Sequence, residues 1–290
     1  MKREDLYKWI DLQPEIVRQL NQIGGSLDLE ALEPHLKRLS DRKTAAQAYR
    51  DLKALFKEDS DHLQMLYCHL ECARRAFDRY EAKHIPQTIY VDTMKCFTRF
   101  IEECGKKNGR LFFDRGWWTY RQVSMSLFRI GELEYEFTSW QGENVIGLHI
   151  PSDADFSEAA VDASLKQAKA FFQTYFGDYH YDKYTCGSWL ISPALTPLLS
   201  GHSNILSFQK RFHVVSEDGK DKEFIEWLFE APIDTDYETL PADTGLRRKV
   251  RELLLNGKTI GSAYGIMKDE SMTGKAAVCL TSGNSPVQCE

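Results

Sequence analysis

The chain contains no apolar stretch of the roughly 20 residues that a membrane-spanning helix needs. Its first residues, Met1 to Asp5, are mostly charged and lack the apolar core of a secretory signal peptide. These two absences exclude the usual marks of membrane insertion and secretion. We therefore expect a cytoplasmic protein without a membrane partner.

The chain also lacks an excess of basic residues. Its 37 Lys and Arg residues are outnumbered by 43 Asp and Glu residues, which gives a net charge of −6. Nucleic acids and anionic membranes bind proteins that carry dense stripes of basic residues, so neither is an expected partner. The short run Arg247–Lys249 is followed by Glu252 and is typical of the solvated face of a helix.

Cysteine is present but forms no disulfide framework. The seven cysteines are odd in number and scattered along the sequence, which favours a reducing compartment. Cys68 and Cys72 lie four residues apart in a helical pattern, with His69 between them. Because no second Cys/His pair follows at metal spacing, we expect buried cysteines and no metal site.

Amphipathic helices fill the sequence up to a change of rhythm near residue 110. Apolar residues recur at three- and four-residue spacing, most clearly from His62 to Tyr80. Six helices with short connections predict an antiparallel bundle over residues 1–115. Pro34 should kink or divide its helix. The predicted helices include 11–23, 29–39, 44–57, 62–80 and 92–104.

Strands and helices alternate in the second half, residues 116–270. Asp155 is the expected N-cap of a long helix, with Glu158 completing a capping box. Residues 271–290 are small, polar and unpatterned, and we predict a flexible tail. The predicted strands are 117–130, 133–140, 145–150, 186–192, 211–216 and its hairpin partner 223–230. The predicted helices are 155–176, 194–200 and 244–256, with residues 203–208 as a link.

Three segments of this half carry a resemblance: Leu148–Ser152, Cys186–Pro193 and Ser203–Phe212. They resemble a bacterial family that pairs a helical N-acyltransferase N-terminal domain with a GNAT-like C-terminal domain. The resemblance covers roughly residues 1–268. It implies an α+β fold, a helical bundle followed by a mixed, mostly antiparallel sheet flanked by helices. It also implies acyl-CoA as co-substrate and a small-molecule amine as acceptor.

The GNAT resemblance implies where the co-substrate binds. Acyl-CoA lies where two central strands splay apart, and its pyrophosphate sits on backbone N–H groups at a helix N-terminus. The loop at that place here is Pro151–Asp155, so Ser152, Asp153 and Ala154 are the expected cofactor-binding residues. This loop departs from the family pattern because it has no glycine and carries two carboxylates. The glycine-rich segment Gly261–Gly265 is a second, weaker candidate, since it follows a helix.

The resemblance also implies direct attack of the amine, helped by a base and by an acid for the leaving thiolate. His149 near a strand end is the candidate base, or a structural histidine. The candidate acids include Ser188 and Ser192, which lie four apart on one strand; turn chemistry at the strand end is the alternative for them. Tyr184 and its neighbours Tyr179 and Tyr181 are also candidate acids, and aromatic cover of a sheet edge is the alternative for these. Cys186 is a nucleophile or a packing residue. The candidate substrate-binding residues are Trp189, Ser203 and Asn204, and an Asx-type turn is the alternative for the last two.

Three functions stay open at this level. The first is a CoA-dependent acyltransferase with the active site in a cleft between the two halves. The second is a non-catalytic, GNAT-like protein that has lost its pyrophosphate loop and binds a small molecule or a protein. The third is an acyltransferase that uses a carrier other than free CoA. The strand order favours the first, whereas the acidic loop favours the second.

Overall fold

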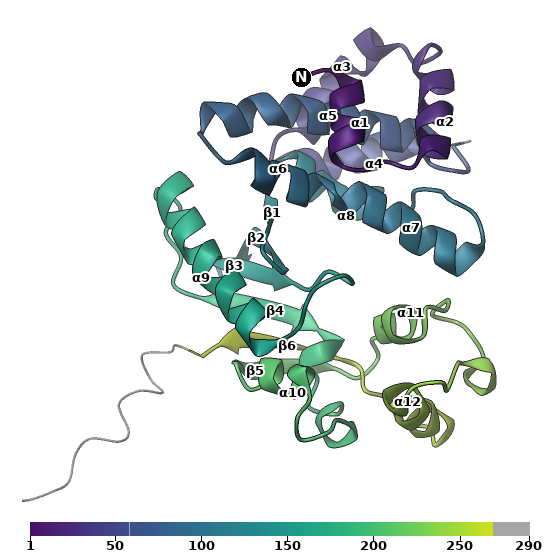
Figure 1. Ribbon diagram of the computed structural model, residues 1–290, viewed down its shortest axis with the longest axis vertical. Helices are drawn as coiled ribbons and strands as arrows, with labels where there is room; N and C mark the ends of the chain where they lie inside the picture. The colour runs from purple at the N-terminus through teal and green to yellow at the C-terminus, as the bar shows by residue number, and fades with distance from the viewer. Residues whose placement is uncertain (58, 269–290) are drawn as a thin grey trace, which may run out of the picture.

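The computed structural model describes residues 1–57 and 59–268, so the predicted tail at 271–290 lies outside the described residues. Eight helices come first in the chain and stack above a sheet (Figure 1). None of the helices in these ranges is long and apolar enough to cross a membrane. The eight are α1 (Arg3–Trp9), α2 (Pro14–Gly24), α3 (Leu29–Leu39), α4 (Ala45–Leu55), α5 (Leu63–Ala82), α6 (Gln87–Met94), α7 (Cys96–Asn108) and α8 (Gly116–Val123).

Helical periodicity predicts α2 to α5 within a few residues, but it misses α1 and merges α6 with α7. Pro34 neither divides nor ends α3, which is a single helix. The proline removes one backbone hydrogen bond, while Leu32, Leu36 and Leu39 bury the same face on both sides of it. Packing of that apolar face therefore outweighs the local cost of the proline.

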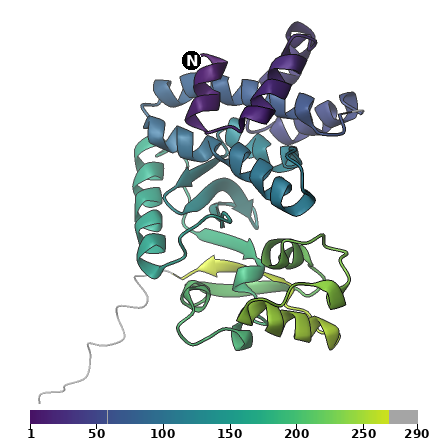
Figure 2. The same ribbon diagram turned by 45° about the vertical axis from the view of Figure 1, so that its right-hand side comes forward.

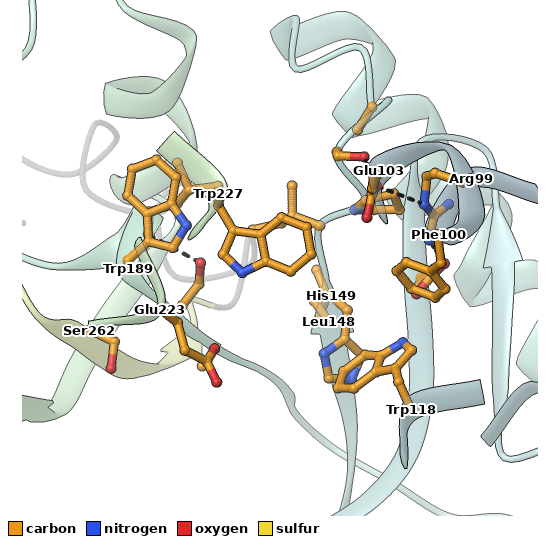
Figure 3. A pocket seen from close by; sticks show the side chains of 18 of the residues that line it. Arg99, Phe100, Glu103, Trp118, Leu148, His149, Trp189, Glu223, Trp227 and Ser262 are labelled. Carbon is orange, nitrogen blue, oxygen red and sulfur yellow. Dashed lines mark hydrogen bonds and ion pairs between the residues drawn. The ribbon is translucent and has the colours of Figure 1, made fainter. Parts of the chain in front are cut away.

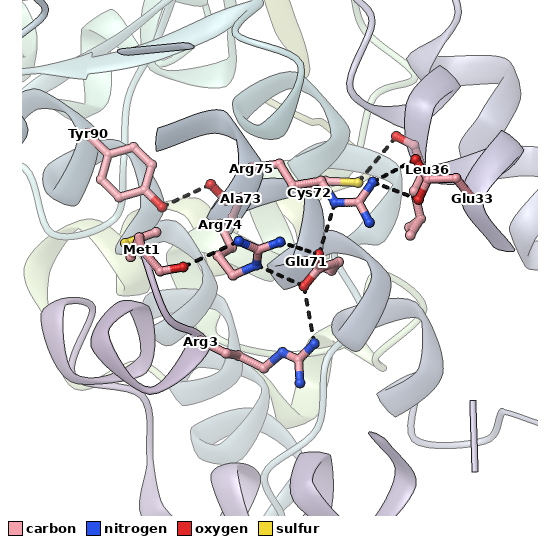
Figure 4. A network of polar contacts seen from close by, with 10 residues as sticks. All are labelled: Met1, Arg3, Glu33, Leu36, Glu71, Cys72, Ala73, Arg74, Arg75 and Tyr90. Carbon is pink, nitrogen blue, oxygen red and sulfur yellow. Dashed lines mark hydrogen bonds and ion pairs between the residues drawn. The ribbon is translucent and has the colours of Figure 1, made fainter. Parts of the chain in front are cut away.

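A buried carboxylate ties α5 to its neighbours (Figure 4). Glu71 accepts hydrogen bonds from Arg74, Arg75 and Arg3, and its side chain is only 4% exposed. Burial alone would raise the pKa of Glu71, but the three guanidinium groups lower it to about 2. Arg75 continues the network to Glu33 at 2.8 Å. The chain start, α3 and α5 are thus joined by one ion-pair network.

Glu71→Gln should destabilise the protein by about 2 to 3 kcal/mol, because it leaves three partly buried guanidinium groups without their counter-charge. The contribution of ionised Glu71 is fully present above its ordinary pKa of 4.5 and is lost as the pH falls toward 2. Urea unfolding at pH 7 and at pH 3 should show a smaller gap between wild type and variant at pH 3. Asp51→Asn, which breaks the exposed pair with Arg38, is the control and should matter far less. An equal effect of both variants would contradict this account.

The six-stranded sheet has the order β1-β2-β3-β4-β6-β5. β3 and β4 are parallel and every other neighbouring pair is antiparallel, so the predicted mixed, mostly antiparallel sheet is confirmed. The strands are β1 (Leu127–Ile130), β2 (Leu133–Trp140), β3 (Glu143–His149), β4 (Tyr184–Ser188), β5 (Phe212–Asp218) and β6 (Ser262–Met267).

Two predicted strands are wrong. The segment 117–130 forms α8 and only then β1. The segment 223–230 forms a helix, α11 (Glu223–Phe229), because Phe224, Ile225 and Phe229 fall on one helical face, which is buried. The antiparallel partner of β5 is instead β6. The predicted glycine-rich loop Gly261–Gly265 enters that strand, so it is not a phosphate cradle.

The connections around the sheet also differ from prediction. α9 (Glu158–Tyr175) packs on β1 and β2, and its N-cap is Ser157. Asp155 lies outside the helix and accepts a hydrogen bond from the Ser157 N–H group at 2.9 Å. The strand predicted at 186–192 ends at Ser188, and short 3₁₀ turns follow. The remaining elements are η1 (Trp189–Ile191), η2 (Thr196–Leu198), α10 (Asn204–Gln209), η3 (Tyr237–Thr239) and α12 (Gly245–Leu255).

Buried apolar side chains form two separate cores. The large core is continuous from α1 through the sheet, so the helices and the strands are packed as one body. The division predicted at residues 115 and 116 stays a prediction. The small core gathers side chains from the connection between β5 and β6, residues 219–261, which we call the C-terminal lobe (Figure 2). Its members are Phe224, Ile225, Phe229, Leu240, Val250, Leu254 and Ile260 from the lobe, and Leu195 from the segment after β4.

Candidate functional site

The two parallel strands separate before either one ends. Their pairing runs from Ile146 and Tyr184 to Leu148 and Cys186, where the ladder stops. Beyond this point Pro151 has no N–H group to offer on one side. On the other side β4 follows β6 to Ser188, whose hydroxyl oxygen accepts the N–H group of Leu190 at 3.1 Å and so starts η1. The strands are therefore open at their carboxyl ends.

A cavity of about 610 Å³ occupies this opening (Figure 3). Its walls come from α7, α8, the loop after β3, the β4–η1 turn and the C-terminal lobe. Aromatic rings from all five segments face it. Among its lining residues are Phe100, Trp117, Trp118, Phe156, Trp189 and Trp227.

His149, the last residue of β3, lines the cavity and is held on two sides. Its Nε2 atom lies 2.8 Å from Oε2 of Glu136 on β2, and the Trp118 ring packs edge-on at 4.8 Å. Arg121 donates to the other Glu136 oxygen at 2.9 Å. Burial alone would raise the pKa of Glu136, but His149 and Arg121 lower it. This arrangement presents one imidazole edge to a carboxylate and keeps the ring at the cavity.

The loop after β3 repels an anion less than its two aspartates suggest. Asp153 is paired with Arg129 at 2.7 Å and with Arg99 at 3.5 Å. Burial alone would raise the pKa of Asp153, but these two arginines lower it. Ser152 donates to the carboxylate of Glu103. The negative charge of Asp153 is therefore locally compensated.

The structure brings five of the predicted site residues together at the cavity: His149, Ser152, Ala154, Ser188 and Trp189. The others lie elsewhere. Ser192 is buried and donates to the carbonyl of Ile260, so it does not share a strand face with Ser188. Tyr184 bonds the hydroxyl of Tyr181 at 2.9 Å and packs against the large core. Ser203 and Asn204 cap and begin α10, and Asp153 is turned to its arginines.

Sequence reasoning missed the residues that reach the cavity from distant parts of the chain. Arg99 lines it from α7 and pairs with Glu134 at 2.8 Å. Trp118 and Trp227 lie in segments predicted as strands, 117–130 and 223–230, and instead reach the cavity from α8 and α11. The alternation of Glu134 and Glu136 with apolar residues in β2 is the sequence signal that could have pointed to Glu136, because it places both carboxylates on one strand face.

Negative charge exceeds positive charge around the cavity. Arg99 and Arg115 line the cavity with five carboxylates, of which Glu134 and Glu103 pair with Arg99 and Glu230 pairs with Arg247. Burial, with the charges of Asp221 and Glu226, raises the pKa of Glu223. Such a wall favours a cationic ligand. No group of three or more metal-ligating side chains occurs among residues 1–57 and 59–268. The lining carboxylates are Glu103, Glu134, Asp221, Glu223 and Glu230.

Comparison with known proteins agrees with this architecture. The family model described as "N-acyltransferase N-terminal domain" matches residues 1–125, and the one described as "GNAT-like C-terminal domain" matches residues 127–267. No curated protein sequence matches the chain.

Several solved structures share the fold. A mutant acyltransferase in complex with octanoyl-CoA is 18% identical over 91% of this chain and 87% of its own, with a TM-score of 0.78. An acyltransferase in complex with decanoyl-CoA and teicoplanin is 19% identical over 92% of this chain and 99% of its own, with a TM-score of 0.68.

Cys186 should not act as a nucleophile, because burial raises the pKa of its thiol to about 12. In a variant with serine at positions 279 and 289, which lie outside the described residues, a thiol reagent at pH 8 should label none of the five remaining cysteines before unfolding and all five after it. Cys186→Ala should leave ligand binding intact. Rapid labelling of Cys186 in the folded protein would contradict this prediction.

Proposed function

We propose that this chain, which belongs to the acyltransferases that pair an N-acyltransferase N-terminal domain with a GNAT-like C-terminal domain, transfers an acyl group from acyl-CoA to an amine. The observation that carries the proposal is the cavity where β3 and β4 separate, with His149 at its edge. The buried free cysteines support a reducing compartment and hence the expected cytoplasmic location. A bacterial source stays a prediction.

The separated strands support binding of the acyl-CoA arm. Backbone groups beyond Leu148 and Cys186 are released from the ladder and can bond the amides of the arm. Apolar side chains such as Phe100 and Phe156 can receive the acyl chain. The pyrophosphate would lie at Ser152 and Ala154 and at the start of α9, where the Ser157 side chain makes no capping hydrogen bond. Structural neighbours bind octanoyl-CoA and decanoyl-CoA.

The acceptor side of the cavity supports a cationic small molecule. Asp221, Glu223 and Glu230 line the cavity from the C-terminal lobe, and Figure 3 shows Glu223 across the cavity from His149. Ammonium groups are attracted to such a wall, whereas the phosphates of CoA are not. One structural neighbour binds teicoplanin. We therefore propose an amine acceptor that approaches from the C-terminal lobe.

The geometry supports direct transfer. His149 accepts a proton from the attacking amine while Glu136 and Trp118 hold the imidazole in place. The amine nitrogen forms a bond to the thioester carbon, and the carbon–sulfur bond then breaks. The Ser188 hydroxyl, whose oxygen accepts from Leu190, has its proton free to bond the leaving thiolate. Both groups come from the ends of the two separated strands.

Calorimetric titration with octanoyl-CoA tests the first step. We expect saturable binding, and a ligand present at about 100 times its dissociation constant should stabilise the fold by about 2.7 kcal/mol. Asp153→Gly should tighten binding by about two- to fivefold, the scale of one partly exposed charge. Weaker binding by this variant would show that the phosphates lie elsewhere. No binding at millimolar concentration would favour the non-catalytic or alternative-carrier function.

His149→Gln should lower kcat for acyl transfer by about 10²- to 10⁴-fold, because the amine loses its proton acceptor. The dissociation constant for octanoyl-CoA should stay within about threefold of wild type, because the substitution removes the proton acceptor and not a group that binds acyl-CoA in the ground state. Steady-state kinetics with a panel of amines provides the measurement. His180→Gln, at an exposed histidine outside the cavity lining, is the matched control and should retain activity. Unchanged turnover in His149→Gln would remove the proposed base.

A further inference from the structure

Glu226 of α11 spans from the C-terminal lobe to the helical part of the chain. One of its oxygens lies 2.7 Å from Nζ of Lys107 at the end of α7, and the same oxygen bonds the Arg115 guanidinium. The side chains are 15%, 20% and 12% exposed, respectively, so water screens them little. Figures 1 and 2 both place α11 beside α7. We call Glu226, Lys107 and Arg115 the latch.

Aromatic rings flank the latch on both sides. The Arg115 guanidinium lies 5.7 Å from the centre of the Trp117 ring and 5.5 Å from the centre of the Trp227 ring. Trp117 belongs to α8, whereas Trp227 belongs to the lobe. Arg115, Trp117 and Trp227 all line the cavity. The latch therefore lies at the edge of the cavity, through Arg115, and joins the two parts.

The lobe packs apart from the large core. Its buried residues belong to the second core, which shares no member with the large core and which Leu195 from outside the lobe completes. It carries one complete wall of the cavity, including Asp221, Glu223 and Trp227. Displacement of the lobe would thus change the width of the cavity without disturbing the wall that holds His149.

The size of the cavity gives such a displacement a consequence for transfer. A volume of about 610 Å³ is that of a pocket for one drug-sized ligand. Transfer needs the end of the acyl-CoA arm and the acceptor together. With the acyl-CoA arm in place, a displacement of the lobe would widen the cavity for the acceptor.

We propose that Glu226 holds the C-terminal lobe closed over the cavity, and that release of the latch opens the cavity to the amine acceptor. The latch itself follows from the contacts alone, whereas the identity of the entering molecule rests on the proposed function.

Hydrogen exchange of the full chain, followed by mass spectrometry, tests the latch without any ligand. Glu226→Lys places three cations together and should speed exchange in residues 219–261 by about tenfold, while α3 to α5 keep their rates. The swap Lys107→Glu with Glu226→Lys restores opposite charges across the gap and should return exchange in the lobe toward wild type. Asp51→Asn, at an ion pair distant from the lobe, should change nothing there.

Two results would overturn the proposal: unchanged exchange in 219–261 for Glu226→Lys, or an increase of equal size throughout the chain. Failure of the swap to slow the lobe would also contradict a charge latch. Titration with octanoyl-CoA distinguishes failure of the latch from failure of the proposed function. If wild type does not bind octanoyl-CoA but Glu226→Lys still speeds exchange in the lobe, the acyltransferase function is rejected and the latch is kept.

Discussion

The separation of β3 from β4 is the constraint on which the rest of the structure depends. A parallel pair that stays bonded to its end leaves no room and no free backbone groups between its strands. Here the pairing stops at Leu148 and Cys186, because Pro151 lies just beyond one strand and Ser188 turns the other into η1. Each strand keeps its other neighbour, so the sheet stays intact while its centre opens.

The helical part and the C-terminal lobe have different physical roles around this opening. The helices share a core with the sheet, and α7 and α8 therefore give the cavity a fixed wall. Glu136 and Trp118 hold His149 on that side. The lobe has its own core and meets the fixed wall through charge and aromatic contacts. A rigid catalytic side and a separable acceptor side follow from this division of apolar packing.

The strand order and the long helices could be predicted because they are local patterns or the order of such patterns. Alternation in β2 and periodicity in α5 are clear in the sequence, and the order of elements implied the GNAT-like sheet. The segment 223–230 was predicted wrongly as a strand because a short apolar run fits either a strand or a helix. Burial of one helical face in the lobe decides between them. Asp155 was predicted wrongly as the N-cap of α9 because an Asx turn and an N-cap use the same residue type.

Half of the candidate site could be predicted and half could not. His149, Ser152 and Ser188 lie at strand ends, and the family resemblance directs attention to such ends. Arg99 and Glu226 reach the cavity or its edge from α7 and α11, and their positions depend on how distant elements pack. The acidic loop after β3 illustrates the same limit, since Arg129, 24 residues away in sequence, compensates the charge of Asp153.

The central claim is that acyl-CoA lies between the separated strands, and photoaffinity labelling tests it most directly. An acyl-CoA with a photoreactive group in its acyl chain would be irradiated with the protein, and the labelled peptides would be identified by mass spectrometry. The account predicts labels within residues 148–156 and 187–190, and their loss when excess octanoyl-CoA competes. Competable labels confined to α1–α4 or to the outer face of α9 would contradict it.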